Sequence, residues 1–345
     1  MTWPQDVAAS IGLDLLGFSL QGRGCSGIPA LSWAIKQDDL CRSGRCMTQI
    51  SKKGVEVEAG FDLRDWAVSS AIITIIKLIG LLPYRWRVPT GGWVVSWIVA
   101  PVIGYRKRVR ENLEFIFPEM PEAEKNRLIR AVPAQIGRTL VELFSPADFK
   151  KVAALSTISG EGLSALDAAG AAGRPIIMVS GHFGNYDAGR FALSQRGFKV
   201  GALYRKMNYK GFNKYYVSQI AEIAEPLFLR GRRGMGEMVK FIKDGNAVAM
   251  LIDQHMAAGA PLTFFGKTAY TALSAADLAL RYDALLVPCY AVRQNDGLHF
   301  DVIVEAPIPH TTPEEMTQAL NDSLEARVRE RMDQWLWTHR RWKEP

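Results

Sequence analysis

An apolar run that ends in a short polar turn constrains the fold of this chain more than any other feature. Residues 176–179, Ile-Ile-Met-Val, form a continuous hydrophobic stretch, which predicts a strand buried on both faces. Ser180 and Gly181 interrupt the run, His182 follows, and a helical pattern covers residues 186–196. A strand followed at once by a helix is the repeating unit of α/β sheets, which place their chemistry at the carboxyl ends of the strands.

The same alternation of short apolar runs and amphipathic stretches continues to the end of the chain. The expected strands are residues 175–180, 198–203, 225–229, 246–252, 285–292 and 298–305. The expected helices are residues 186–196, 211–224, 234–244, 272–282 and 313–335. This pattern predicts an α/β fold with a central, mostly parallel or mixed sheet that helices flank on both faces.

His182 and Asp187 are the first candidate pair for chemistry. On one continuous helix, residues five positions apart point about 140° away from each other, so a contact requires the loop before the helix to fold back. In that arrangement the Asp187 carboxylate orients His182 and leaves one ring nitrogen as a general base. The alternative is a histidine that only caps the strand or the turn, and the spacing alone favours that alternative.

Basic turns follow two further strands. Arg205 stands at the end of one strand, and Arg232 and Arg233 lie between glycines just before a helix. Arginine at such positions suits a phosphate or a carboxylate. The alternative for each turn is a solvated basic loop.

Asp253 and Gln254 end another buried strand, and Asp253 is either a structural hydrogen-bond acceptor or a site residue. His255 follows them but ranks below His182, because Asp253 is the only carboxylate near it in sequence. A metal site built on the two histidines lacks a third ligand at the usual spacing.

The charge balance restricts the partners. The net charge is +7, and acidic and basic residues balance within residues 1–60, so the excess lies in residues 61–345. A basic body favours anionic lipid, an acidic protein or nucleic acid, but no zinc-finger spacing, RNP-like strand or basic heptad region supports nucleic acid. The four cysteines form no CxxC pair, which predicts neither a disulfide framework nor a zinc site and suits a reducing cytoplasm.

The amino-terminal third divides into two parts. Residues 1–60 show no sustained periodicity and are predicted to be a poorly ordered extension. One hypothesis is that translation begins at Met47, so that residues 1–46 do not belong to the native protein; the intact mass of the natively expressed protein decides this.

Residues 61–105 are predicted to be a helical segment that anchors the protein in a membrane. Asp65 is expected to cap a helix that begins at Trp66, and aromatic and basic residues follow its apolar run, as at a membrane interface. A run of about 16 residues spans about 24 Å, less than the roughly 30 Å of a hydrocarbon core. Single-span and interfacial anchoring both stay open, and the alternative is a pair of buried core helices.

The motifs together resemble the lipid A biosynthesis late acyltransferases (lauroyl and myristoyl transferases) of the lysophospholipid acyltransferase-like superfamily. The resemblance covers residues 64–343 and identifies residues 106–345 as the acyltransferase domain. It rests on an HX4D motif, His182 to Asp187, and on a series of motifs in matching order: Arg110-Glu-Asn112-Leu113, Gly181 to Asn185, Tyr204-Arg205, Arg232-Arg-Gly234, Asp253-Gln254, Phe264-Phe-Gly266 with Thr271, Pro288 with Arg293, and Gln334 to Trp342.

The resemblance implies an enzyme on the cytoplasmic face of the inner membrane that needs no metal or cofactor. The acyl donor would be an acyl–acyl carrier protein, and the acceptor would be the hydroxyl of a 3-hydroxyacyl chain on a Kdo-bearing lipid A precursor. His182 would be the general base and Asp187 its orienting acid. The implied substrate-binding residues are Asn185, Arg205, Arg232, Arg233, Asp253 and Gln254.

Two positions depart from the family pattern. The acid of the motif is Asp187, where these enzymes often have glutamate, and residues 218–225 lack an expected arginine and glycine. Two alternatives are a related acyltransferase with another acceptor, such as a phosphatidylinositol mannoside or an aminolipid, and a membrane-bound lipid-binding protein without catalysis. The presence of both His182 and Asp187 counts against the last alternative.

Overall fold

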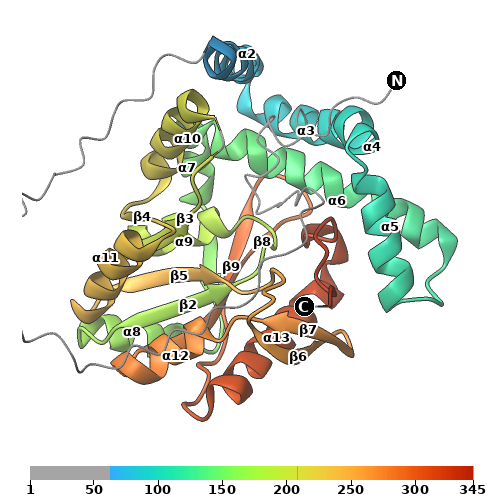
Figure 1. The fold of residues 1–345 in the computed structure, drawn as a ribbon. Helices are drawn as coiled ribbons and strands as arrows, with labels where there is room; N and C mark the ends of the chain where they lie inside the picture. The colour runs from blue at the N-terminus through green and yellow to red at the C-terminus, as the bar shows by residue number, and fades with distance from the viewer. Residues whose placement is uncertain (1–62, 208, 345) are drawn as a thin grey trace, which may run out of the picture.

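A seven-stranded sheet forms the centre of the molecule (Figure 1). A computed structural model of the chain describes residues 63–207 and 209–344. The order of the strands is β1-β9-β8-β2-β5-β3-β4, and every neighbouring pair is parallel except β8 and β9. The strands are β1 (Thr157–Ser159), β2 (Ile176–Ser180), β3 (Val200–Tyr204), β4 (Leu227–Leu229), β5 (Ala247–Leu251), β8 (Leu285–Arg293) and β9 (Phe300–Val304). The predicted α/β fold with a mostly parallel sheet is confirmed.

Helices cover both faces of this sheet. On one face α8 and α9 contact the strands, with α7 and α10 packed outside them; on the other face α11, α12 and α13 contact the strands. The helices of the first face are α7 (Pro146–Ala153), α8 (Leu163–Ala171), α9 (Tyr186–Gln195) and α10 (Lys210–Ile223). Those of the second face are α11 (Arg232–Lys243), α12 (Ser274–Tyr282) and α13 (Pro313–Glu330).

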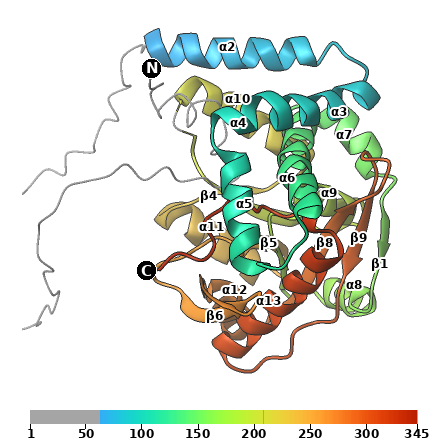
Figure 2. The ribbon, with the colours of Figure 1, turned by 90° about the vertical axis from the view of Figure 1, so that its right-hand side faces the viewer.

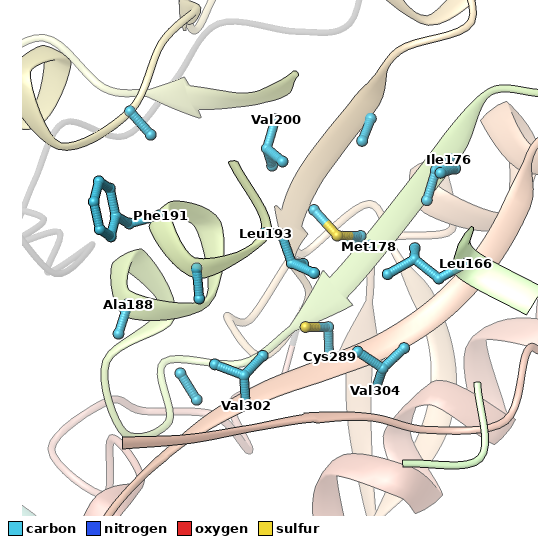
Figure 3. Close-up of a cluster of buried hydrophobic side chains, with 14 of the residues drawn as sticks. Leu166, Ile176, Met178, Ala188, Phe191, Leu193, Val200, Cys289, Val302 and Val304 are labelled. Carbon is cyan, nitrogen blue, oxygen red and sulfur yellow. The ribbon is translucent and has the colours of Figure 1, made fainter. Parts of the chain in front are cut away.

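Strand β2 shows why the run 176–179 is apolar at every position. Successive side chains of a strand point to opposite faces of its sheet. Ile176 and Met178 belong to the core under α8 and α9, shown in Figure 3, whereas Ile177 and Val179 belong to the core under α12 and α13. All four side chains are at most 4% exposed. The strand is therefore buried on both faces, as the continuous run predicts.

The amino-terminal helices lie along one end of the molecule (Figures 1 and 2). They are α2 (Leu63–Ile79), α3 (Tyr84–Val94), the π-helical turn η2 (Val95–Val99) and α4 (Ala100–Val102), and they lead into α5 (Tyr105–Ile116) and α6 (Glu122–Leu143). Helix α2 packs on α10. The Asp65 carboxylate accepts hydrogen bonds from the backbone N–H groups of Lys210 (2.7 Å) and Gly211 (3.0 Å). The predicted role of Asp65 is thus corrected: it lies inside α2 and caps α10.

Apolar side chains of the segment from α2 to α4 face outward. Leu81 is 81% exposed and Val102 is 77% exposed, and the same segment carries most of the large exposed apolar side chains among the described residues. No single described helix is long and apolar enough to cross a membrane. Residues 84–102 and 105–116 meet the length and composition criteria only together, as a pair bent by 85°.

Three features of the fold differ from the sequence-based expectation. The short edge strand β1 and a hairpin of β6 (Ala260–Phe264) and β7 (Lys267–Thr271) were not predicted. Phe264 of this hairpin and the adjacent Phe265 are both at most 5% exposed, in an aromatic cluster. Helix α13 ends at Glu330 rather than at 335. The predicted extension 1–60 and the start at Met47 fall outside the described residues.

The contact between α3 and α6 depends on glycine. A Cβ atom on Gly137 of α6 would lie 2.4 Å from the backbone oxygen of Gly91 in α3. We expect Gly137→Ala to lower the free energy of unfolding by about 1–3 kcal/mol, the usual effect of overpacking. Gly236→Ala in α11 is the control, since nothing lies within 4 Å of its added Cβ. Equal thermal stability of the two variants would contradict this packing.

Candidate active site

The register between β2 and β5 brings His182 and Asp253 together. Ser180 of β2 pairs with Leu251 of β5, and the two strands are parallel. His182 and Asp253 each lie two residues beyond this pair, so both side chains emerge at the same carboxyl edge of the sheet. His182 Nδ1 lies 2.8 Å from Asp253 Oδ1, and the His182 backbone N–H donates to Asp253 Oδ2 (2.6 Å).

The Asp253 carboxylate is buried and ionised. Trp335 Nε1–H donates a third hydrogen bond, to Oδ2 (2.9 Å). Burial raises the pKa of Asp253, but the charge of His182 and the hydrogen bonds from His182 and Trp335 outweigh burial and lower the pKa to about 2. An ionised carboxylate only accepts hydrogen bonds, so His182 carries its proton on Nδ1. Nε2 forms no hydrogen bond with any described residue.

Asp187 does not pair with His182. Its Oδ1 accepts a hydrogen bond from Arg190 Nη1 (2.7 Å), and both side chains are at most 7% exposed. Arg190 also donates to the backbone oxygen of Ala224 (2.9 Å). Because Asp187 lies in the first turn of α9, its carboxylate meets the side chain one turn later on that helix. The expected His182–Asp187 contact is therefore corrected: the carboxylate that touches His182 is that of Asp253.

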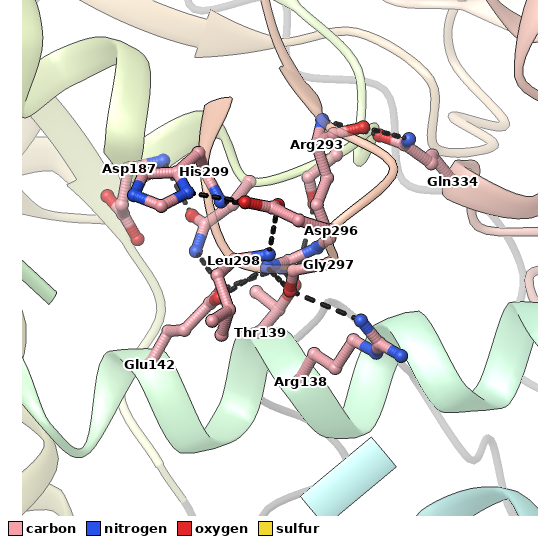
Figure 4. A network of polar contacts seen from close by, with 12 residues as sticks. Arg138, Thr139, Glu142, Asp187, Arg293, Asp296, Gly297, Leu298, His299 and Gln334 are labelled. Carbon is pink, nitrogen blue, oxygen red and sulfur yellow. Dashed lines mark hydrogen bonds and ion pairs between the residues drawn. The ribbon is translucent and has the colours of Figure 1, made fainter. Parts of the chain in front are cut away.

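Asn185 is held inside the protein and not in a binding cavity. It caps α9, its Oδ1 accepting from the Asp187 backbone N–H (3.1 Å). Its Nδ2 donates to Glu142 Oε2 (2.7 Å), and the Asn185 side chain is 2% exposed. Glu142 forms a buried ion pair with Arg293, shown in Figure 4. Asn185 was predicted to bind substrate, whereas the contacts that the structure shows for its side chain are the cap of α9 and the bond to Glu142.

Gly184 brings this turn against the neighbouring strand. Its φ is +57°, and a Cβ atom there would lie 1.9 Å from the backbone oxygen of Ala291 in β8. Only glycine adopts this conformation at such a close approach without strain. Gly184 and the buried Glu142–Arg293 pair thus hold the loop that carries His182.

A cavity of about 440 Å³ opens beside His182. This volume falls within the roughly 300–1,000 Å³ of small-molecule sites. Its walls come from β2, β3, β5, α9 and α10, and they are mostly apolar. The apolar lining includes Met178, Leu193, Ala202, Ile220, Leu227 and Ala249. His182 therefore contributes a polar group to a mostly apolar cavity.

Some of the predicted polar residues line this cavity, and others do not. Arg205 and Gln254 line it, and so does Arg230, which the motif comparison had not selected. Arg232 and Arg233 do not line it: both are exposed, and Arg233 Nε donates to Glu237 Oε1 (3.0 Å). The structure thus does not bring Arg232 and Arg233 to His182.

Burial keeps two other reactive side chains, Cys289 and His339, in their neutral forms. Burial raises the pKa of the Cys289 thiol to about 12, so it stays protonated at neutral pH. Burial lowers the pKa of His339 to about 3, and its Nε2 accepts a hydrogen bond from the His255 backbone N–H (3.0 Å). The described residues contain no group of three or more His, Cys, Asp or Glu that could hold a metal ion.

The arrangement suits base catalysis in an apolar cavity, and comparison with known proteins places it in a family. One family model, described as bacterial lipid A biosynthesis acyltransferase, matches residues 60–344. The chain belongs to this family. Membership of an acyltransferase family agrees with a histidine that lines a mostly apolar cavity.

Relatives of this family member act on more than one lipid. It is 20% identical to a lipid A biosynthesis acyltransferase of Haemophilus influenzae, over 79% of this chain and 86% of that protein. It is 26% identical to the lipid A biosynthesis lauroyltransferase of Escherichia coli, over 69% and 78%. It is 25% identical to a phosphatidylinositol mannoside acyltransferase of Mycobacterium tuberculosis, again over 69% and 78%.

Sequence reasoning missed two side chains of this site, one beside His182 and one bonded to Asp253. The Tyr186 ring stands edge-on to the His182 imidazole, with centroids 5.8 Å apart. Trp335 reaches Asp253 from a segment more than 80 residues away. Tyr186 lies inside the HX4D motif, which was a usable signal, whereas nothing local in the sequence connects Trp335 to Asp253.

The lowered pKa of Asp253 predicts a specific loss of stability in acid. A carboxylate whose pKa falls from 3.8 to about 2 on folding stabilises the protein above pH 4. This contribution, about 2 kcal/mol, disappears as the pH falls from about 4 to 2. We expect the difference in free energy of unfolding between wild type and Asp253→Asn to shrink by that amount over this range. A constant difference in urea titrations would contradict the pairing.

Proposed function

We propose that this protein transfers a fatty acyl chain from an acyl–acyl carrier protein to the hydroxyl of a 3-hydroxyacyl chain on a Kdo-bearing lipid A precursor. The observation that carries the proposal is the His182–Asp253 pair at the mouth of an apolar cavity. Membership of the lipid A biosynthesis acyltransferase family supports the same reaction class.

His182 acts as the general base. Its Nδ1–H donates to Asp253, which leaves Nε2 to accept the proton of the acceptor hydroxyl. The hydroxyl oxygen attacks the thioester carbonyl, the carbon–sulfur bond breaks, and the thiolate leaves with the proton carried by His182. Asp253 stabilises the imidazolium between these two proton transfers, as the carboxylate of a catalytic triad does.

The apolar walls of the cavity and its arginines bind different parts of the substrates. The apolar walls accept the acyl chain, because its methylene groups leave water on entering them. Arg205 and Arg230 line the same cavity from the loops after β3 and β4, and both are exposed. Their guanidinium groups suit a phosphate of the carrier protein's prosthetic group or of the glycolipid.

The apolar end of the molecule binds the cytoplasmic face of the inner membrane. The exposed Trp86 and Trp97 lie beneath arginine guanidinium groups, Arg85 over Trp86 (5.3 Å) and Arg106 over Trp97 (5.2 Å). Exposed tryptophan beside arginine is typical of membrane interfaces. Helix α10 packs against α2 and also lines the cavity, so this docking places the cavity beside the bilayer.

A second acceptor class has its own support. Two of the similar proteins are phosphatidylinositol mannoside acyltransferases, and their identity to this chain equals that of the lipid A enzymes within a few per cent. An acyltransferase with another lipid acceptor would use the same base and the same cavity. Only the acceptor-binding residues would differ.

Mass spectrometry of the lipids of a deletion strain separates the two acceptors. We expect lipid A to lose one secondary acyl chain, because the deletion removes the enzyme that is proposed to add it. Restoring the gene should restore the chain. An unchanged lipid A with an altered phosphoinositide or aminolipid profile would contradict the lipid A acceptor and favour the second candidate.

The base is tested by substitution. We expect His182→Ala to reduce acyl transfer from acyl–acyl carrier protein by at least about 10²-fold, the usual contribution of a general base. His299→Ala is the control, since His299 pairs with the exposed Asp296 outside the cavity. Near-normal activity of a folded His182→Ala protein would refute the role.

The membrane surface is tested with vesicles of phosphatidylethanolamine and phosphatidylglycerol. We expect the double variant Leu81→Glu/Val102→Glu to bind them at least about tenfold more weakly, because two exposed apolar side chains no longer enter the bilayer. Leu155→Glu, at a side chain 68% exposed and outside this segment, is the control. Equal vesicle binding of all three proteins would contradict this surface.

A further inference from the structure

Trp335 connects the carboxyl-terminal segment to the proposed base. It is 2% exposed, and its indole Nε1–H donates to Asp253 Oδ2 (2.9 Å). The backbone of Trp335 also pairs with Phe183, the residue after His182, in an isolated antiparallel bridge. The Gly184 backbone N–H donates to the Gln334 backbone oxygen (2.9 Å). One short segment thus supports both the carboxylate and the loop that carries the histidine.

The hydrogen bonds on Asp253 divide unequally between its two oxygens. Among the described residues, Oδ1 is hydrogen-bonded only to His182 Nδ1, whereas Oδ2 accepts from the His182 backbone N–H and from Trp335. The two donors on Oδ2 fix the plane of the carboxylate and leave Oδ1 to the imidazole. Without the indole donor, Oδ2 keeps one partner and the carboxylate gains freedom to rotate about its Cβ–Cγ bond.

The other charged or titratable groups that face this pair come from two elements. Tyr186 of α9 stands edge-on to the imidazole, and burial keeps its pKa well above the usual value, so it is neutral. His339 and Arg341 of the carboxyl-terminal segment act on Asp253 through space. Burial keeps His339 neutral, and Arg341 donates to the Tyr270 backbone oxygen (2.7 Å). Of these side chains, Trp335 donates a hydrogen bond to the Asp253 carboxylate, so its loss changes the hydrogen bonding of Asp253 directly.

We propose that Trp335 is a positioning residue of the acyl transfer: its indole N–H orients Asp253 so that His182 holds the Nδ1–H tautomer and presents Nε2 to the acceptor. The predicted effect of Trp335 on the rate of acyl transfer rests on the proposed function. Its effect on the titration of His182 requires no substrate.

The test compares Trp335→Phe with Trp337→Phe. Phenylalanine keeps an aromatic ring and removes only the N–H donor and part of the ring area. Trp337 is the matched control, because it is fully buried in the same aromatic cluster and its Nε1–H donates to the Met332 backbone oxygen (2.8 Å) instead. If Trp335→Phe does not fold, benzothienylalanine at position 335 keeps the shape of the indole and lacks only the N–H.

We expect Trp335→Phe to lower kcat about tenfold and to leave KM for both substrates within about twofold, since a hydrogen bond to a charged group contributes on the order of one to two powers of ten. The acid limb of the kcat/KM profile should move to higher pH by about one unit. The less stabilised carboxylate attracts the imidazolium proton more strongly. Trp337→Phe should keep the wild-type profile.

A ¹⁵N NMR titration of the His182 imidazole, without substrate, separates this inference from the proposed function. A higher His182 pKa in Trp335→Phe alone supports the positioning role even if no acyl transfer to lipid A is detected. An unshifted titration in Trp335→Phe, or an equal shift in both variants, overturns it. A shifted titration with unchanged kcat, in an enzyme that transfers acyl chains, also overturns it.

Discussion

The candidate active site depends on keeping one buried carboxylate ionised. Removing Asp253 from water favours its neutral form, and an uncompensated buried charge is strongly destabilising. Three donors from two distant segments compensate it: His182 Nδ1, the His182 backbone N–H and Trp335 Nε1. The pKa of Asp253 consequently falls to about 2 instead of rising. Because the carboxylate stays charged, it accepts the hydrogen bond of His182 Nδ1–H and leaves Nε2 as the nitrogen that we propose to be the base.

This arrangement requires several parts of the fold at once. The β2–β5 register sets His182 beside Asp253, and Gly184 lets the loop approach β8 closely enough to bind it. Gln334 Nε2 donates a hydrogen bond to the Arg293 backbone oxygen (2.7 Å), and Gln334 Oε1 accepts one from the Arg293 backbone N–H (2.8 Å). The Glu142–Arg293 pair anchors the same region from α6. The acidic partner of His182 is thus set by tertiary structure and not by the HX4D spacing.

The sequence predicted the elements of the fold better than the contacts of the site. All six predicted strands exist, because runs such as 176–179 are apolar on both faces of the sheet. His182 was placed correctly at a strand end. The pairing with Asp187 was wrong, because sequence spacing shows neither that β5 is the neighbour of β2 nor that Arg190 takes the Asp187 carboxylate. The basic turn with Arg232 and Arg233 was found, but the arginine that lines the cavity is Arg230, because the direction of the β4–α11 loop decides which side chain reaches it.

The most direct test of the account compares Asp253→Asn with Asp187→Asn in acyl transfer from acyl–acyl carrier protein. Both substitutions remove one buried carboxylate charge, but only Asp253 contacts His182. The account predicts that kcat falls by about 10²-fold or more in Asp253→Asn, and that folded Asp187→Asn keeps most of its kcat and loses stability instead. A folded Asp187→Asn protein as inactive as His182→Ala, beside an Asp253→Asn protein with near-normal kcat, would contradict the account.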